Sequence, residues 1–209
     1  IVDEAHRSYN PTGSFLANLM GSDRNAVQIA LTGTPLIGDG YNTKDVFGNY
    51  IHKYYYNQSI ADGYTLKLIR EEIETSYKNP MKETLDQIVK KGSIAKKDIY
   101  SHPKFVEKMV DYIVQDFTEG RTALDSSIGA MIVCDSSEQA IEVDKQLERL
   151  SVYTHALVLY NEGTKQERKN DQDEFKKGNI DILVVYNMLL TGFDAPRLKK
   201  QYLARMIKA

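Results

Sequence analysis

The sequence has few of the features that mark secreted and membrane proteins. Its 209 residues include one cysteine, Cys134, so no disulfide can form within the chain. This cysteine usage is typical of a reducing compartment, and we expect the protein to be cytoplasmic. No apolar run approaches the roughly 20 residues needed to cross a bilayer. The first residues also lack the charged, apolar and small-residue order of a signal peptide. Together these absences favour a globular protein that works without a membrane.

Net positive charge is also missing. The 27 Lys and Arg residues are offset by 29 Asp and Glu residues, which leaves a formal net charge of −2. A nucleic acid would therefore bind at a local face, because no overall positive field attracts it. The basic residues that could line such a face are Lys90, Lys91, Lys96, Lys97 and Arg121. Charge clusters on helices are more often solvated surface, and that interpretation stays open.

From residue 128 onward, short apolar runs alternate with helical stretches. Residues 130–133, 156–159 and 180–185 form the apolar runs, and residues 137–150 and 165–177 have helical periodicity. Continuous apolar strands separated by helices predict a parallel sheet that is covered on both faces. We therefore expect an α/β fold with ligand-binding residues at the carboxyl ends of its strands, where residues 134–135 and Asn187 fall.

The earlier part of the chain has a different pattern. Residues 1–2 are typical of the end of a buried strand, residues 14–20 of a short helix, and residues 27–31 of a second apolar strand. Because a strand cannot usefully start two residues before its functional end, we expect further sequence to precede Ile1. Residues 81–89 and 105–117 carry apolar stripes at helical spacing, so we expect two helices that pack on a neighbouring sheet.

Two carboxylates follow the first apolar segment. In the Walker-B arrangement, the first carboxylate at a strand end holds Mg²⁺ through water and the second deprotonates the attacking water. Asp3 and Glu4 fit these two roles. An Asp-Glu pair is also common as a helix cap or a salt-bridge partner, and that plainer interpretation remains open.

Two further motifs close apolar segments. Thr32, Gly33 and Thr34 follow residues 27–31, and hydroxyls at such a position can report the loss of a γ-phosphate by changing hydrogen bonds. Residues 185–196 include Thr191, Gly192 and Asp194. There backbone amides can approach a phosphodiester or a nucleotide, and the aspartate can accept from a ribose hydroxyl or an arginine. Each motif alone is also compatible with a simple turn.

The order of these motifs resembles motifs II, III and V of superfamily 2 helicases. The strings are DEAHRS at 3–8, LTGTPL at 31–36 and LLTGFDAP at 189–196. With FGNYIH at 47–52 and IADGY at 60–64, they are similar to the motor (R) subunit of type I restriction enzymes in particular. This resemblance covers essentially the whole chain. It implies RecA-like sheets with flanking helices, namely the C-terminal part of a first lobe at 1–60 and a second lobe at 61–209. The second lobe would contain a helical insertion at about 79–125 and be truncated at its C-terminus.

The resemblance also implies an activity and a set of partners. Such a motor uses ATP and Mg²⁺ to translocate double-stranded DNA before cleavage, in a complex with methylation and specificity subunits, as part of an ATP-dependent site-specific deoxyribonuclease. Asp3, Glu4 and His6 would be catalytic, with His6 coupling hydrolysis to DNA movement. Thr32, Gly33 and Thr34 would belong to motif III, and residues 131–137 to motif IV. Thr191, Gly192 and Asp194 would belong to motif V and bind nucleotide or DNA.

Two parts of the expected motor are missing from the sequence. No G-x-x-x-x-G-K-[ST] string occurs, so the amides and lysine that cradle phosphates are absent. The motif VI arginines are absent as well, and they contribute roughly 10³ to 10⁵ in rate. We therefore expect the chain alone to be inactive. Two other functions remain open, a superfamily 2 motor that acts on RNA or chromatin and a non-catalytic, degenerate motor that serves as an assembly module.

Overall fold

The chain divides into two compact units, Ile1–Arg70 and Glu71–Ala209, in a computed structural model. The structure describes residues 1–6, 14–22, 25–38, 42–73, 75–91, 98, 100–190 and 192–204. Each unit is considered by itself below. The assignment of the two units to two helicase lobes stays a prediction.

The second unit is built on a four-stranded parallel sheet with the order β2-β3-β1-β4. The strands are β1 (Gly129–Val133), β2 (His155–Val158), β3 (Ile182–Val185) and β4 (Leu198–Leu203). All residues of β1 and β3 are buried, as expected for central strands with both faces covered. The α/β fold and the parallel sheet predicted from the sequence are therefore confirmed.

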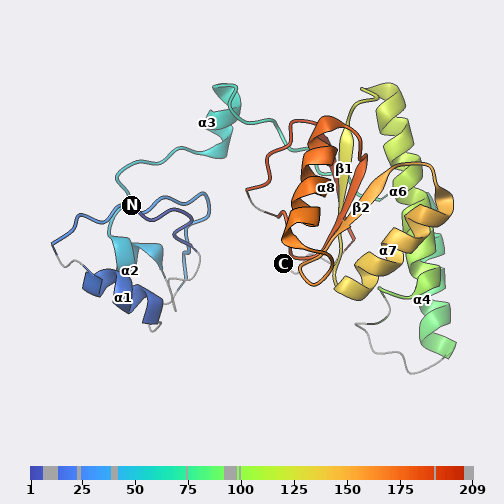
Figure 1. Ribbon diagram of the computed structural model, residues 1–209, viewed down its shortest axis with the longest axis horizontal. Coiled ribbons are helices and arrows are strands. Elements are labelled where there is room, and N and C mark those ends of the chain that lie inside the picture. Colours follow the sequence, from blue (N-terminus) through green and yellow to red (C-terminus); the bar gives the residue numbers. More distant parts are fainter. Residues whose placement is uncertain are drawn as a thin grey trace. The chain divides into compact units, whose positions relative to one another are not determined.

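Helices cover both faces of this sheet (Figure 1). On one face lie α6 (Pro103–Ala123) and α7 (Ser137–Leu150), with α4 (Thr75–Lys91) packed against α6. On the other face lies α8 (Lys165–Lys177), drawn in orange. The apolar stripe predicted for residues 105–117 is confirmed, because its four members are buried in the core on the first face: Phe105, Met109, Ile113 and Phe117.

The ends of α7 and α8 follow from local chemistry. The Ser136 hydroxyl accepts from the Gln139 amide at the start of α7. At the start of α8, Thr164 and Glu167 form a capping box, in which each side chain bonds the other residue's backbone N–H. Such caps satisfy amides that the helix itself leaves unpaired, so they set where each helix begins.

Strand β4 was not predicted from the sequence. It lies at the edge of the sheet, and its side chains alternate between half-buried and exposed positions. The start of neighbouring β1 requires glycine, since a Cβ on Gly129 would lie 2.6 Å from the ring of Phe175. The Arg197 side chain fixes the entry to β4, because it donates to the carbonyls of Ser127, Phe175 and Ile180.

The first unit is smaller and has little regular structure. It contains α1 (Ser14–Ser22), α2 (Thr43–Phe47) and α3 (Tyr56–Ala61). The helix predicted at 14–20 is confirmed. The strand predicted at 27–31 is wrong, because only Ala30 pairs, in an isolated parallel bridge with Val2. Val27 is 87% exposed. Among the described residues this segment pairs with one neighbouring segment, and a single β-bridge is too little to stabilise a strand.

No helix in the described part of the chain is both long enough and apolar enough to cross a membrane.

Candidate functional site

The carboxylate motif is held against residues 29–31 by backbone hydrogen bonds. The Val2 amide donates to the Ile29 carbonyl at 2.8 Å, and the Leu31 amide donates to Val2 at 2.8 Å. The Ala5 amide donates to Leu31 at 3.0 Å, and Ala5 is fully buried. Residues 2–5 therefore run beside residues 29–31, which brings the two sequence-predicted motifs of this unit together.

His6 joins the two motifs through one ring nitrogen. Its Nδ1 lies 2.8 Å from the Thr32 hydroxyl and 3.3 Å from Oε2 of Glu4. The His6 side chain is 19% exposed, whereas that of Glu4 is 48% exposed. The carboxylate therefore faces solvent, where a substrate water could reach it, while the imidazole behind it contacts the second motif. Thr32 extends the chain of contacts, since its hydroxyl accepts from the Thr34 amide at 3.1 Å.

Glu4 has an unusual backbone, with a φ of +50°. A left-handed conformation is disfavoured for a residue with a side chain, and such residues gather at functional sites. The backbone amide of Glu4 donates a hydrogen bond to Oδ1 of Asp3 at 2.8 Å. This turn places the two consecutive carboxylates on an exposed corner.

The carboxylate pair fits a magnesium site of the nucleotide-dependent kind. No cluster of three or more His, Cys, Asp or Glu side chains suited to a metal occurs among the described residues. Mg²⁺ does not need one, because it is usually bound by one or two carboxylates together with substrate phosphates and waters. Asp3 is exposed and uses Oδ1 for the Glu4 amide. Its other oxygen is a suitable acceptor for a metal-bound water.

The third predicted motif lies in the second unit, after β3. Thr191 lies outside the described residues. Gly192 has a φ of +72°, a conformation that favours glycine. Crowding is not the reason, because no atom lies within 4 Å of the position that a Cβ would take. Asp194 is exposed and makes no hydrogen bond or ion pair in the part of the chain that the structure describes.

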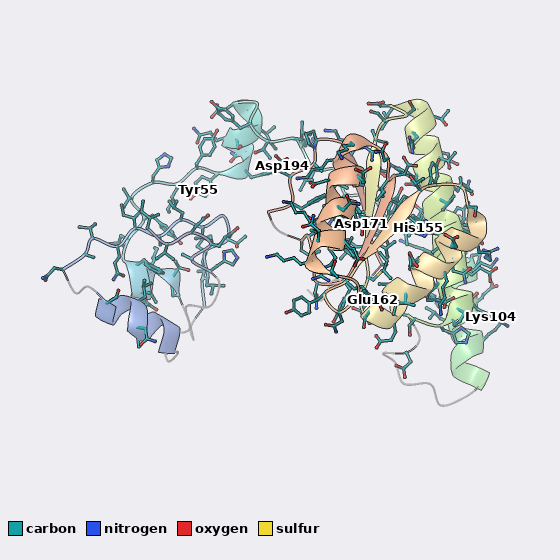
Figure 2. The ribbon with its side chains drawn as sticks, viewed as in Figure 1. Tyr55, Lys104, His155, Glu162, Asp171 and Asp194 are labelled. Carbon is teal, nitrogen blue, oxygen red and sulfur yellow. The ribbon has the colours of Figure 1, made fainter. Side chains whose placement is uncertain are left out.

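The position of Asp194 differs from the expectation that it lies at the carboxyl ends of the strands. Its neighbour Phe193 packs against Phe175, and the Lys176 ammonium lies 5.4 Å from the Phe193 ring. Both contacts are in the last turns of α8. Figure 2 accordingly shows Asp194 near the opposite end of α8 from Glu162. Because β4 runs parallel to β1 and β3, it begins at the opposite end of the sheet from the carboxyl end of β3, and Asp194 precedes β4 in the chain.

The end of β1 holds a buried amide that the sequence analysis missed. Gln139 is fully buried, and its Oε1 accepts from the Asp135 amide at 2.7 Å. Its Nε2 donates to the carbonyls of Tyr100 and Ala204, both at 3.0 Å. Gln139 therefore ties α7 to the ends of β1 and β4. The sequence offered one signal for the burial of Gln139, namely its position in the helical pattern one residue before the apolar Ala140.

Cys134 also falls at this strand end, but its side chain is turned into the core. It is fully buried, and burial raises the pKa of its thiol to about 12. A buried thiol that stays protonated is a poor nucleophile.

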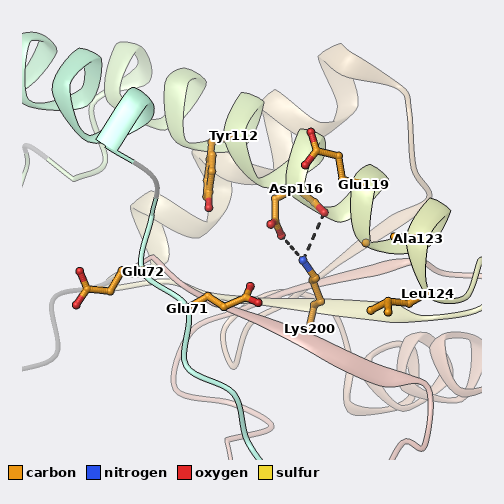
Figure 3. A pocket seen from close by; sticks show the side chains of 9 residues that line it. Glu71, Glu72, Tyr112, Asp116, Glu119, Ala123, Leu124 and Lys200 are labelled. Carbon is orange, nitrogen blue, oxygen red and sulfur yellow. Dashed lines mark hydrogen bonds and ion pairs between the residues drawn. The ribbon is translucent and has the colours of Figure 1, made fainter.

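Two basic side chains of this unit are used internally. Arg121 lies 2.5 Å from Asp181, and both side chains are largely buried, so this arginine serves the fold. Lys200 contacts Oδ2 of Asp116 at 2.6 Å, and the Tyr202 hydroxyl donates to the same oxygen at 2.5 Å. This cluster borders a cavity of about 500 Å³ beside α6 (Figure 3). None of the site residues predicted from the sequence lines that cavity.

Comparison with known proteins covers both units. Residues 1–100 match the SWI2/SNF2 ATPase family, and residues 130–209 match type I restriction enzyme subunit R domain 3. Two relatives align with all of this chain. They are the HindI type I restriction enzyme endonuclease subunit of Haemophilus influenzae, at 27% identity, and the EcoAI endonuclease subunit of Escherichia coli, at 24% identity. The chain spans 23% and 27% of these two relatives.

A solved structure gives the same fold. The helicase domain of Pyrococcus furiosus Hef matches 98% of the chain, and 64% of the Hef chain, with a TM-score of 0.51 at 14% identity. At this identity the likeness shows a helicase-like fold. The two matched families follow one another along the chain in the order in which the motifs were found. The chain is therefore a homologue of the R subunits of type I restriction enzymes, with a SWI2/SNF2-like ATPase region and a helicase-like fold.

Proposed function

We propose that this chain forms the central part of an ATP-driven motor that translocates double-stranded DNA in a type I restriction enzyme. The observation that carries this proposal is the position of His6, whose Nδ1 lies within contact distance of both Glu4 and Thr32. Glu4 belongs to the carboxylate motif and Thr32 to the hydroxyl motif. A motor needs such a link, because hydrolysis must change a contact that leads away from the nucleotide.

Proton transfer to Glu4 would change this link directly. As general base, the Glu4 carboxylate accepts a proton from the attacking water. The ionised carboxylate attracts a proton on Nδ1 of His6, and the neutral acid attracts it much less. The His6 N–H then interacts chiefly with the Thr32 hydroxyl. Since that hydroxyl also accepts from the Thr34 amide, a change at Glu4 reaches residues 32–34 through two hydrogen bonds.

Asp3 would hold Mg²⁺ through water in this arrangement, and the ion, when bound, would offset the negative charge of the ATP phosphates. The proposed partners are double-stranded DNA and the methylation and specificity subunits. Gly192, Asp194 and Thr191 would contact nucleotide or DNA.

The 209-residue chain should hydrolyse ATP negligibly by itself. Its sequence contains neither a phosphate loop nor the motif VI arginines, so no group is present to cradle the β- and γ-phosphates or to offset charge in the transition state.

The role of Glu4 is tested by Glu4→Gln in an R subunit that combines this segment with a phosphate loop. Glutamine keeps the shape and most hydrogen bonding but cannot accept the proton, so ATP hydrolysis should fall to background while ATP binding persists. Glu162→Gln, at an exposed carboxylate of the second unit, is the matched control. Turnover that survives Glu4→Gln would assign the base to another residue.

A further inference from the structure

Thr43 is a buried polar residue to which the sequence analysis assigned no role. It is the first residue of α2 and is 5% exposed, whereas residues 44–47 of the same helix are half-buried or exposed. The buried polar or charged side chains among the described residues are Thr43 and Gln139. Burial of a hydroxyl costs free energy unless the hydroxyl is hydrogen-bonded, so the partner of Thr43 is informative.

The partner of Thr43 is the backbone of Leu36, the last residue of the LTGTPL string. The Leu36 amide donates to the Thr43 hydroxyl at 2.9 Å, and the Thr43 amide donates to the Leu36 carbonyl at 3.0 Å. Ile37 and Asn42 form an antiparallel bridge beside this pair. Thr43 therefore holds both backbone polar groups of Leu36.

Side-chain burial does not explain how this part of the loop is fixed. Leu36 is 37% exposed and Ile37 is 82% exposed, and Gly33 and Thr34 are exposed as well. Exposed side chains contribute little packing. The two hydrogen bonds of Thr43 therefore anchor the exit of an otherwise exposed loop.

The Thr43 hydroxyl is not needed to begin the helix. A threonine at a helix start commonly uses its hydroxyl to accept from a helix amide. Here Asn42 is the cap, and its side chain accepts from the Lys44 amide at 2.9 Å. The Thr43 hydroxyl is thereby left for Leu36, and it links the loop to the first turn of α2.

Pro35 stiffens the connection between Thr34 and Leu36. Its ring fixes φ at about −65° and restricts the backbone of the residue before it. Little of a displacement at Thr34 can therefore be absorbed at Pro35, and the displacement reaches Leu36. On its other side, the Thr34 amide donates to the Thr32 hydroxyl, which contacts His6.

We propose that Thr43 is a positioning residue that carries a rearrangement of residues 32–34 into α2 through its hold on Leu36. This transmission rests on the proposed motor function, whereas the anchoring of Leu36 does not. Thr43 acts through the loop and touches neither nucleotide nor DNA. Helix α2 is then displaced when Glu4 changes its protonation state.

A matched set of threonine substitutions isolates the hydroxyl. Thr43→Val keeps the size of the side chain and removes its hydroxyl, whereas Thr43→Ser keeps the hydroxyl and loses a methyl group. Thr65→Val is the control, because Thr65 is a half-buried threonine of the same unit whose hydroxyl contacts Ser59. The anchor is measured by native-state hydrogen exchange of the Leu36 amide in the 209-residue chain. Transmission is measured as base pairs translocated per ATP hydrolysed in an R subunit that carries each variant.

We expect Thr43→Val to speed exchange of the Leu36 amide roughly tenfold, the usual effect of losing one hydrogen bond. In the R subunit it should lower the translocation ratio severalfold at a nearly unchanged rate of ATP hydrolysis. A variant that hydrolyses ATP at this rate is folded, so its lowered ratio reports coupling. Thr43→Ser should restore both readouts, and Thr65→Val should leave both at their wild-type values.

Two kinds of result would count against Thr43. Unchanged exchange of the Leu36 amide in Thr43→Val would overturn the anchor. Faster exchange at a wild-type translocation ratio, or a lowered ratio that Thr43→Ser does not restore, would overturn the coupling role. Failure of the proposed motor function is seen separately, as ATP turnover that survives Glu4→Gln.

Discussion

At the scale of single residues, the position of the ring proton on His6 determines whether its Nδ1 donates to Thr32 or accepts from it. A protonated Nδ1 donates to the Thr32 hydroxyl and is attracted by Glu4. An unprotonated Nδ1 could accept from Thr32 but would direct its lone pair toward a carboxylate. The tautomer with a proton on Nδ1 is therefore favoured while Glu4 is ionised.

The His6–Thr32 hydrogen bond should be measurable as a coupling energy. We expect His6→Ala and Thr32→Val to be non-additive by about 0.5–1.5 kcal/mol, the usual net value of one hydrogen bond. Native-state hydrogen exchange of the Ala5 and Leu31 amides gives a local readout, since these amides join the two segments. His6→Ala combined with Thr164→Ala, in the second unit, should be additive. Additivity of His6→Ala and Thr32→Val would mean that the contact contributes no coupling free energy.

At the scale of elements, Gln139 has the largest expected effect on stability. Gln139→Leu would leave the Asp135 amide and the carbonyls of Tyr100 and Ala204 without their buried partner, at about 1–3 kcal/mol for each unsatisfied group. We expect a loss of several kcal/mol in urea unfolding of the second unit. Gln146→Leu on the same helix removes a less buried amide and should cost far less. Similar losses for both variants would contradict the account of Gln139.

The contact between α7 and β2 should depend on pH through His155. The hydrogen bond that the His155 ring donates to the Asp144 carboxylate raises the pKa of His155 above its usual value; burial opposes this shift, and the Tyr153 carbonyl and the Glu148 charge add to it. A raised folded-state pKa means that this contribution is fully present below the unfolded-state pKa of roughly 6.5 and is lost as pH rises through the folded pKa. Thermal unfolding from pH 5.5 to 8.5 should show this loss in the wild type and a flatter profile in His155→Gln. His52→Gln, at an exposed histidine of the first unit, should keep the wild-type profile.

An element could be predicted from the sequence when the interactions that form it lie within its own segment. The helices at 137–150 and 165–177 were predicted to the residue, because caps and periodicity lie within each segment. The strands at 130–133 and 182–185 are apolar throughout, since both faces are covered. Strand β4 and the failed strand at 27–31 depend on neighbours that composition does not reveal. In the candidate site, the roles of the motif residues remain predictions from the sequence. The His6–Thr32 contact and the left-handed backbone at Asn187 and Leu189 could not be predicted, because both depend on three-dimensional arrangement.

At the scale of the whole molecule, the proposed motor parts are shared between the two units. The carboxylate and hydroxyl motifs belong to Ile1–Arg70, and the 187–194 segment belongs to Glu71–Ala209. The chain spans about a quarter of the length of two type I restriction enzyme relatives, so the motor activity is proposed for an R subunit that carries this segment. In such a motor, ATP hydrolysis and DNA movement are measured separately, and a coupling residue is defined by its effect on their ratio.

The most direct test of the account is the number of base pairs translocated per ATP hydrolysed, measured in an R subunit that carries this segment. His6→Ala keeps the base Glu4 but removes the contact with Thr32. The account predicts that this ratio falls sharply, with ATP hydrolysis reduced much less than translocation. His52→Ala, at an exposed histidine of the same unit, should leave the ratio unchanged. A His6→Ala motor in which translocation and hydrolysis decline in equal proportion, with the ratio of the wild type, would contradict the coupling role of His6.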